Sequence, residues 1–434
     1  MTWGAPVNAS RRHGFTLLIS LALGCVSADE PTTSTDAGGA TPDAGSDRCD
    51  GFDFTEMPAL AEMMGVYDER RQRIVFFGGD DVLPVNCSSA PHAVGRFELY
   101  TYDTACGAFR EETGSSGPRG RARGMAVYDP QGDRMILFGG RSRARETGDY
   151  KNYNDVWALN LETMEWTELV PSNRGPMARS NPAGGFNRAT RELIVFGGNT
   201  SRNGLAFSPR NDVWALDTVN LTWRQIEADG TKPTARLFHA AAVDDTNNRL
   251  FVYGGGDAGA WQGPFLGDLW MMDLESGAWE RLASFSAEDG PAARIWSSIT
   301  YDVASDRVVL FGGHDDGEVG NNNDTWSFEL SERSWSAVVA PETVSEPALG
   351  FCNFPPNFTE PNLEAPDRRS AHLAALDKQR GEWFIFAGKT DCGIINDIWV
   401  YDLARDAWLK RQPSTVGEAC VRSENPDRCV ALCQ

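Results

Sequence analysis

Short apolar runs that end in glycine recur along the chain at nearly constant intervals. The six runs occupy residues 74–79, 135–140, 193–198, 250–255, 308–313 and 383–388. The first glycines of five runs, at 78, 139, 197, 254 and 312, are separated by 61, 58, 57 and 58 residues, and a step of 75 leads to Ala387 in the last run. Internal periodicity of this kind predicts one structural unit that is repeated along the chain.

Each unit contains four segments with the length and composition of β-strands. In the second unit we expect strands at 123–128, 134–138, 155–159 and 166–169. Runs of four or five apolar residues bounded by glycine indicate strands that are covered on both faces. Sheets that stack face to face around an axis bury their strands in this way.

Tryptophan repeats with the same period. Ten of the 14 Trp residues form pairs nine positions apart: Trp157 and Trp166, Trp214 and Trp223, Trp270 and Trp279, Trp326 and Trp335, and Trp399 and Trp408. Tyr100 and Phe109 have this spacing in the first unit. We expect these side chains to lie on the third and fourth strands and to supply packing area between neighbouring sheets.

The apolar run with its glycine doublet, the Asn-Asp-x-Trp segment and the later Trp together resemble the kelch repeat. The resemblance covers about residues 49–412 in six copies. It implies an all-β fold, a six-bladed kelch-type β-propeller with four antiparallel strands per blade. The first blade departs most, because it lacks both Trp residues and the Asn-Asp pair. Two ways to close the ring stay open: segment 54–57 joins the sheet of blade 6, or the last blade closes on Trp408 alone.

The N-terminal residues predict export. Arg11 and Arg12 precede an apolar run at 15–23, whose nine residues are too few to cross a bilayer, so residues 1–24 are expected to be a signal peptide. The run ends near Cys25 in a segment that resembles a bacterial lipobox, which implies a lipid on Cys25; the alternative is an ordinary cleavage site with an incidental cysteine. Residues 25–48 are rich in Thr, Ser, Asp and Gly and predict a flexible linker. We therefore expect a protein anchored by lipid to the bacterial outer membrane or cell surface, or a periplasmic one.

The cysteine count is consistent with that compartment. There are nine Cys residues, and a lipid on Cys25 leaves an even number, which suggests disulfides in an exported chain. Cys352, in an insertion at 341–366, and Cys392, in the blade 6 loop, are expected on the same face and form the candidate disulfide. The C-terminal tail at 413–434 carries Cys420, Cys429 and Cys433, one of which is a candidate to reach Cys49 or Cys87.

Charge limits the classes of partner. The 434 residues include 40 Lys and Arg and 61 Asp and Glu, for a formal net charge of -21. An acidic protein repels the nucleic-acid backbone at long range, so we expect no nucleic-acid partner, although a local basic patch stays open. We expect a monomer that contacts the membrane only through its N-terminal lipid.

Loop lengths predict which face of the propeller carries function. The connection between the first and second strands, after Asp68, Asp129, Asn187, Asp244, Asp302 and Asp377, has one length in every blade. From the second glycine to the third-strand aromatic the separations are 21, 17, 16, 15, 13 and 11 residues. In antiparallel order these variable loops share one face. Variable loops on a rigid scaffold usually carry the binding residues.

An arginine recurs at the start of the innermost strand. Eight residues before each turn residue stand Arg121, Arg179, Arg236, Arg294 and Arg369, with Leu60 in the blade 1 position. One interpretation is a central cluster that grips a carboxylate, phosphate or sulfate, as equivalent arginines do in some kelch domains that capture acidic peptides. The other is that a residue present in every blade stabilises the blade by pairing with a nearby Asp or by capping carbonyls.

Residues that break the repeat are further candidates for a ligand site. They are Trp296, Trp261, His239, His314 and His372, together with Arg141, Arg143, Arg145, Tyr150, Lys151 and Tyr153 in the blade 2 loop. Exposed aromatic side chains there would suit stacking on sugar rings or peptide side chains, and the alternative is loop packing.

These observations favour a binding module for a protein or glycan partner on the cell envelope, without metal or cofactor. Whether the propeller is also an enzyme stays undecided. The resemblance admits a carbohydrate-active alternative, such as a sugar mutarotase or epimerase, and, with His239, His314, His372 and Tyr253, a copper oxidase. A third alternative is a structural module of an envelope assembly. A deep axial pocket would favour an enzyme, and a shallow face with exposed aromatics would favour a binding module.

Overall fold

A computed structural model describes residues 49, 57–81, 96–112, 116–143, 150–201, 206–228, 230–260, 263–285, 289–315, 320–343, 362–390 and 393–415. The predicted signal peptide, Cys25, the linker up to residue 48, Trp261, Cys352, Cys392 and most of the tail lie outside these residues. Within these ranges no helix has the length and hydropathy needed to cross a membrane.

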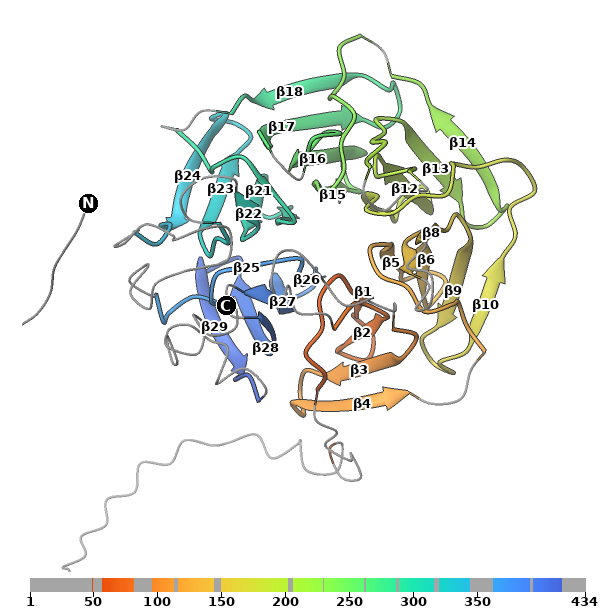
Figure 1. Cartoon of the computed structure of the whole chain (residues 1–434), viewed down its shortest axis with the longest axis horizontal. Helices are drawn as coiled ribbons and strands as arrows, with labels where there is room; N and C mark the ends of the chain where they lie inside the picture. The colour runs from red at the N-terminus through yellow and green to blue at the C-terminus, as the bar shows by residue number, and fades with distance from the viewer. Residues whose placement is uncertain are drawn as a thin grey trace, which may run out of the picture. The chain divides into compact units, whose positions relative to one another are not determined.

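The described residues form six antiparallel sheets of four principal strands, arranged as blades around one axis (Figure 1). Blade 1 contains β1 (Met64–Asp68), β2 (Arg73–Phe77), β3 (Leu99–Asp103) and β4 (Ala108–Glu112). Blade 2 contains β5 (Met125–Asp129), β6 (Arg134–Phe138), β9 (Val156–Asn160) and β10 (Trp166–Leu169). Blade 3 contains β11 (Ala183–Asn187), β12 (Glu192–Phe196), β13 (Val213–Asp217) and β14 (Thr222–Ile226). The expected strands of the second unit agree with these bounds to within two residues.

Blades 4 to 6 follow the same order. Blade 4 contains β15 (Ala240–Asp244), β16 (Arg249–Gly255), β17 (Leu266–Asp273) and β18 (Trp279–Ala283). Blade 5 contains β20 (Ser298–Asp302), β21 (Arg307–Phe311), β23 (Thr325–Glu329) and β24 (Ser334–Val339). Blade 6 contains β26 (Leu373–Asp377), β27 (Glu382–Thr390), β28 (Gly393–Asp402) and β29 (Ala407–Gln412). Three short strands lie in the variable loops of blades 2 and 5, namely β7 (Arg141–Arg143), β8 (Tyr150–Asn152) and β22 (His314–Asp315), and β22 pairs with β19 (Arg294–Ile295), which precedes β20. A fifth, β25 (Arg369–Ser370), pairs with β27. The predicted six-bladed all-β propeller is confirmed.

The turn between the first two strands of each blade is built by one side chain. In blade 1 the Asp68 carboxylate accepts hydrogen bonds from the backbone N–H groups of Arg70 and Arg71, both at 3.2 Å. An Asx side chain bonded to the backbone two and three residues on fixes a tight turn. Asp68 consequently lies opposite Arg73. The same register recurs in every blade, so the innermost strands all end at one level.

The fourth strand of each blade packs on the second strand of the blade before it. Trp279 of β18 lies 5.4 Å, between ring centroids, from Phe196 at the end of β12. Equivalent contacts at 4.7–5.6 Å join Trp166 to Phe77, Trp223 to Phe138, Trp335 to Tyr253 and Trp408 to Phe311. Aromatic pairs at this separation add to the apolar area that they bury. The repeated fourth-strand aromatic thus joins one blade to the next.

The same contact closes the ring between its first and last blades. Phe109 of β4 lies 6.0 Å from Phe386 of β27, and Leu60 accepts a backbone hydrogen bond of 3.0 Å from Gly388. Blade 6 is completed by β29, which carries Trp408, so each blade is continuous in sequence. Of the segment 54–57, only Met57 is described, and its carbonyl accepts a hydrogen bond of 2.7 Å from Asn396.

Charged side chains meet near the axis on the face of constant turns. Arg188 of blade 3 contacts Glu69 of blade 1 and Asp245 of blade 4, and Lys378 of blade 6 lies 3.0 Å from Asp245. Each of these residues directly follows the Asx residue that ends an innermost strand. The four side chains therefore connect four of the six blades across the centre of this face.

A disulfide joins Cys49 to Cys106, with 5.6 Å between the Cα atoms. Cys106 lies in the turn between β3 and β4, at the outer edge of blade 1. The expectation that a tail cysteine reaches Cys49 is wrong, because Cys49 is already bonded within the first blade. The proposed Cys352–Cys392 bond lies outside the described residues and stays a prediction.

Candidate functional site

The five repeated arginines are buried inside their blades. Arg294 contacts both carboxylate oxygens of Asp324, at 2.5 and 2.8 Å, and donates hydrogen bonds to the carbonyls of Gly312 and Ala292 at 3.0 and 2.9 Å. Asp324 also accepts a hydrogen bond of 2.8 Å from Trp326. The same arrangement joins Arg121 to Asp155, Arg179 to Asp212, Arg236 to Asp268 and Arg369 to Asp397.

This geometry matches the structural interpretation of the arginine ring. All five arginine residues have an exposed fraction of 0%. Burial alone would lower the pKa of Arg294, but the charge and hydrogen bonds of Asp324 outweigh it and raise that pKa above its ordinary value. The carbonyl of Arg121 accepts a hydrogen bond of 3.0 Å from Gly79, and Arg179, Arg236 and Arg369 accept equivalent bonds, so these four arginines join their own blades to the preceding ones. Bidentate pairs of this kind are strong and fix the planar guanidinium group in place.

A second set of equivalent residues lies two positions after the arginines, at the centre of the variable-loop face. We call these residues the axial ring: Glu62, Arg123, Asn181, Phe238, Trp296 and Ala371. All six have positive φ, between 53° and 62°. Five backbone hydrogen bonds of 2.6–3.2 Å connect successive members around the axis. The left-handed backbone is sparsely populated by residues other than glycine and is held here by these bonds to neighbouring members.

The side chains of the axial ring fill the centre of this face. Arg123 forms an ion pair with Glu62, which also lies 2.8 Å from the Lys389 ammonium group. The Arg123 guanidinium lies 5.7 Å from the ring centroids of both Phe238 and Trp296, which are 4.4 Å apart. Burial acts to raise the pKa of Glu62, but the positive charges of Arg123 and Lys389 outweigh it and lower that pKa well below its usual range. A buried ion pair thus occupies the position where a deep axial pocket would open.

Arg141 and Tyr153 come together in the blade 2 loop. The guanidinium groups of Arg141 and Arg143 lie 4.4 and 5.0 Å from the Tyr150 ring centroid. Tyr153 is buried beneath Lys151 and Arg121, and its hydroxyl forms a hydrogen bond of 2.7 Å with Ser142. Burial and, next, the charge of Arg123 lower the pKa of Arg141 to about 10. This loop is a cluster of cations on aromatic rings.

The predicted histidines do not form one site. His239 packs edge-on against Phe196 at 5.0 Å and His372 against Phe311 at 5.2 Å, each between two blades. Burial, with a smaller effect of the neighbouring arginine, lowers the pKa of both imidazoles to about 3, so they are neutral. His314 is half-buried in β22, and its backbone pairs with Ile295. In the ranges given above, no group of three or more His, Cys, Asp or Glu side chains is placed to hold a metal ion.

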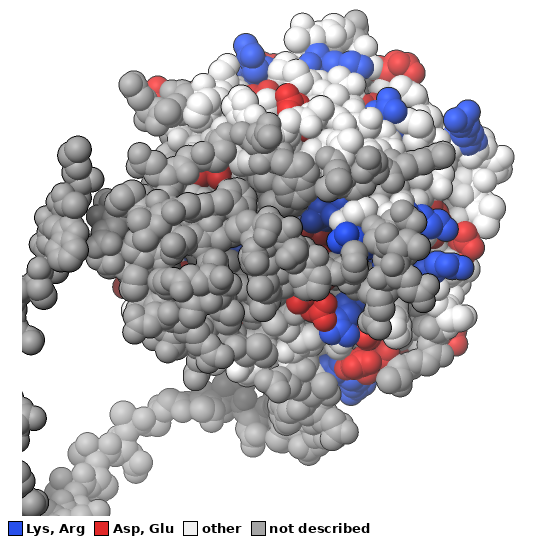
Figure 2. Space-filling view, viewed as in Figure 1, with Lys and Arg blue, Asp and Glu red and all other residues white. Residues whose placement is uncertain are grey.

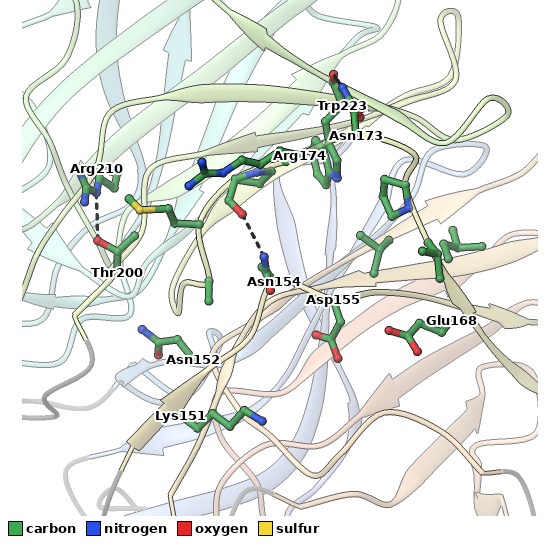
Figure 3. Close-up of a pocket in the computed structure, with 18 of the residues that line it drawn as sticks. Lys151, Asn152, Asn154, Asp155, Glu168, Asn173, Arg174, Thr200, Arg210 and Trp223 are labelled. Atoms are coloured by element: carbon green, nitrogen blue, oxygen red, sulfur yellow. Dashed lines mark hydrogen bonds between the residues drawn. The ribbon is translucent and has the colours of Figure 1, made fainter.

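A pocket of about 860 Å³ lies off the axis, between blades 2 and 3 (Figure 3). It is bounded by β8 and the start of β9, by the end of β10, by the connection 171–178 that leads into blade 3, and by Thr200, Ser208 and Arg210 of the blade 3 loop. β8, the start of β9 and the blade 3 loop belong to the variable-loop face, while the connection 171–178 begins beside the turn before β14, where Ser172 donates a hydrogen bond to the Leu221 carbonyl. We call this pocket the interblade groove.

Comparison with known proteins supports the family that the repeat resembles. Residues 185–353 match the family model described as the KLHDC2/KLHL20/DRC7 Kelch-repeats domain. The chain is also 29% identical to Kelch domain-containing protein 10 of Rattus norvegicus over 263 residues, which is 59% of this chain and 58% of the rat protein. The matched residues are a kelch-repeat region, and the chain is similar to kelch-repeat proteins.

Other relatives are much longer chains, of which this chain matches only a part. The chain is 24% identical to the leucine-zipper-like transcriptional regulator 1 homolog of Drosophila melanogaster, in a match that covers 65% of this chain and 25% of that protein. The chain is 26% identical to the flagellar outer arm dynein alpha chain of Chlamydomonas reinhardtii, in a match that covers 49% of this chain and 5% of that protein. The chain thus spans less than two thirds of each of these relatives.

Several residues of the two sites could not be found from the kelch pattern. Arg123 and Phe238 stand at the same repeat position as Trp296, but only the tryptophan stood out by its residue type. Glu62 occupies the corresponding position of the irregular first blade. Arg174 and Arg210 line the groove from two different connections, whose sequences do not repeat. The position two residues after each arginine is the signal that would have revealed the axial ring.

Proposed function

We propose that this kelch propeller is a binding module that holds a partner protein on its variable-loop face. The observation that supports it most directly is the interblade groove, which is open between two blades and is lined by exposed polar side chains. On the opposite face, the Asx side chains are used within the fold: Asp129, for example, accepts hydrogen bonds from Gly132 and Arg134 and pairs with Arg191. The two faces therefore divide scaffold and recognition between them.

The filled axial centre supports a binding module in preference to the carbohydrate-active alternative. Glu62 and Arg123 are 7% and 9% exposed, and Phe238 is 3% exposed. A pyranose held for chemistry needs a concave site that encloses most of its surface. A protein segment that lies along a groove does not need such a cavity at the axis.

Site-specific photocrosslinking tests the proposed face. p-Benzoylphenylalanine is placed at Lys151, Met177 or Ser208 on the variable-loop face and, as matched controls, at the exposed turn positions Val219, Val303 or Arg405 on the other face. We expect covalent complexes with the same protein species, in extracts of the producing cells, from the first set only. Crosslinks of equal yield from both faces, or from the turn positions alone, would contradict the proposal.

We also propose that the module is exported and tethered through a lipid on Cys25. The Cys49–Cys106 disulfide supports export, because such bonds persist in oxidising compartments. The test is the mass of the N-terminal peptide after expression of the full chain in a bacterium that processes lipoproteins. A diacylglyceryl-modified Cys25, and release of the Cys25→Ser variant from the membrane fraction, are expected. An unmodified peptide that spans residues 20–30 would refute the tether.

A further inference from the structure

The interblade groove carries uncompensated positive charge in an acidic protein. Lys151, Arg174 and Arg210 are all exposed, and none of them forms an ion pair with another described residue. Arg210 donates one hydrogen bond, of 3.0 Å, to Thr200. The net charge of the whole chain is -21, so a cluster of three unpaired cations is not explained by composition. Figure 2 shows basic and acidic side chains intermixed over the coloured part of one face, with no continuous field of either sign.

The charge of the groove is divided between its two ends. Figure 3 places Lys151, Arg174 and Arg210 around one half of the groove and Asp155 and Glu168 around the other. Asp155 is already neutralised, because its carboxylate pairs with Arg121 and accepts a hydrogen bond from Trp157. Glu168 is exposed and forms no ion pair with the described residues. The groove therefore presents a strongly positive end and a single negative charge opposite it.

Apolar side chains border the groove as well. Val170 and Met177 have exposed fractions of 72% and 42%, the former next to Glu168 and the latter near Arg174 in the chain. The amide groups of Asn154 and Asn173 are held by the local backbone, through bonds to Pro176 and Trp223 at 3.4 and 2.7 Å. Fixed walls of this kind, with apolar contact area beside cations, suit an extended chain that carries both apolar and charged side chains.

We propose that the interblade groove binds an extended protein segment whose acidic residues lie against Lys151, Arg174 and Arg210, with a neutral or basic residue beside Glu168. Charge complementarity determines this partner, since opposite potentials across an interface set both orientation and specificity. The arginines of the repeat are not part of this site, because they are consumed inside the blades. The inference rests on the proposed function and specifies the partner of the same face.

Fluorescence anisotropy with synthetic peptides tests the proposal on the purified propeller with its disulfide intact. The probe is a short fluorescein-labelled peptide in which Glu alternates with Ala, and the comparison peptide carries Gln in place of every Glu. We expect the Gln peptide to bind at least tenfold more weakly. We also expect the affinity of the Glu peptide to fall between about 50 and 500 mM NaCl, since exposed charges are screened over that range.

Charge-reversal variants locate the binding. Lys151→Glu, Arg174→Glu and Arg210→Glu are combined, and the matched control combines Arg281→Glu, Arg405→Glu and Lys410→Glu, which changes the net charge by the same amount at distant exposed positions. The groove variant is expected to lose at least tenfold in affinity, while the control loses less than threefold. Removal of the single negative charge in Glu168→Gln is expected to tighten binding of the Glu peptide by about twofold to fivefold, the range for one exposed charge pair.

Three outcomes would overturn the inference: equal binding of the Glu and Gln peptides, equal losses in the two triple variants, or binding of a short polyuronate oligosaccharide at the groove without binding of the peptide. The two proposals fail separately. Crosslinks from Met177 and Ser208 without any peptide binding would support the proposed binding face and refute the proposed acidic segment. Peptide binding with crosslinks from the turn positions alone removes the proposed face for the native partner.

Discussion

At the residue scale, the propeller depends on buried arginines whose donors are almost all used. Arg294 donates to the carboxylate of Asp324 at the start of the third strand, to the carbonyl of Gly312 after the second strand, and to the carbonyl of Ala292 before its own strand. Asp324 is 1% exposed, so its charge would have no water to replace the guanidinium. Removing one partner therefore destabilises the fold by more than the pair contributes to stability, because the other charge is left buried and unpaired.

Arg294→Ala is accordingly expected to lower the free energy of unfolding by about 3–5 kcal/mol, the range for breaking one partner of a buried pair. Arg294→Lys should recover only part of this loss, because an ammonium group cannot form the bidentate contact. Urea denaturation followed by tryptophan fluorescence measures both. Arg405→Ala, at a side chain 82% exposed, serves as control and should change stability by less than about 0.5 kcal/mol. A loss in Arg294→Ala no larger than that of the control would contradict this account.

The two buried imidazoles make stability depend on pH. His239 and His372 have a pKa of about 3 in the folded protein and of 6.5 when exposed, so the unfolded chain binds more protons between these values. Stability is therefore fully present above pH 6.5 and is lost as the pH falls toward 3. The double variant His239→Phe, His372→Phe should show a flatter decline of unfolding free energy between pH 6.5 and 4.5. A slope identical to that of the unmodified protein would exclude the histidines as its source.

At the element scale, the glycine doublet and the fourth-strand aromatic connect one blade to its neighbours. Gly255 has φ of 96°, and a Cβ there would approach the Leu237 carbonyl to 2.7 Å and the His239 Cβ to 2.8 Å. A larger residue at the second doublet position would therefore press against the start of the innermost strand of its own blade. Ala387 replaces a first glycine at φ of 54°, which shows that the first position demands less.

Trp279→Ala tests the packing of one blade on the preceding one. The side chain is 9% exposed and contacts Phe196 across the interface, so its removal is expected to cost about 3–5 kcal/mol. Leu409→Ala, at a side chain 53% exposed on the outer strand of blade 6, is the control and should cost less than about 1 kcal/mol. Denaturation midpoints of the two variants decide between interface packing and a general effect of truncation; similar midpoints would reject the interface role.

At the scale of the whole molecule, both ends of the axis are occupied by charged contacts between blades. Glu62, Arg123 and Lys389 meet on the variable-loop face, while Glu69, Arg188, Asp245 and Lys378 meet on the other. These contacts join residues that are distant in sequence. They hold the ring together without a strand shared between its first and last blades.

The disulfide adds a covalent constraint to the first blade only. Cys106→Ser is expected to lower the unfolding free energy by about 2–4 kcal/mol, the usual range for one native disulfide. Denaturation with and without reductant checks the assignment. In oxidising buffer the variant should be less stable than the unmodified protein, and reductant should remove that difference. Val219→Ser, at another exposed turn, is the control. If oxidised Cys106→Ser and the oxidised unmodified protein unfold at the same denaturant concentration, the bond does not stabilise the ring.

The repeat made the fold predictable, because period, glycine doublets and turn residues specify the strands of every blade. Trp166 and Trp223 could be placed on fourth strands because they recur. The axial ring escaped prediction, since Glu62, Arg123 and Phe238 share a position but not a residue type. The interblade groove was predicted only in part: Lys151 was a candidate in the blade 2 loop, but Arg174 and Arg210 come from two other connections of unrelated sequence, which only the completed ring brings together with it.

The continuity of every blade in sequence has an evolutionary consequence. A tandem duplication or a deletion of one unit of about 58 residues inserts or removes a complete blade, and no sheet is cut in the process. Circular permutation should also be tolerated at any of the six junctions, because each has an aromatic contact between a fourth strand and the second strand of the neighbouring blade. The junction between blades 1 and 6 lacks a peptide connection and has Phe109 and Leu60 where the other junctions have Trp and Arg, so it is the weakest point at which the ring can open.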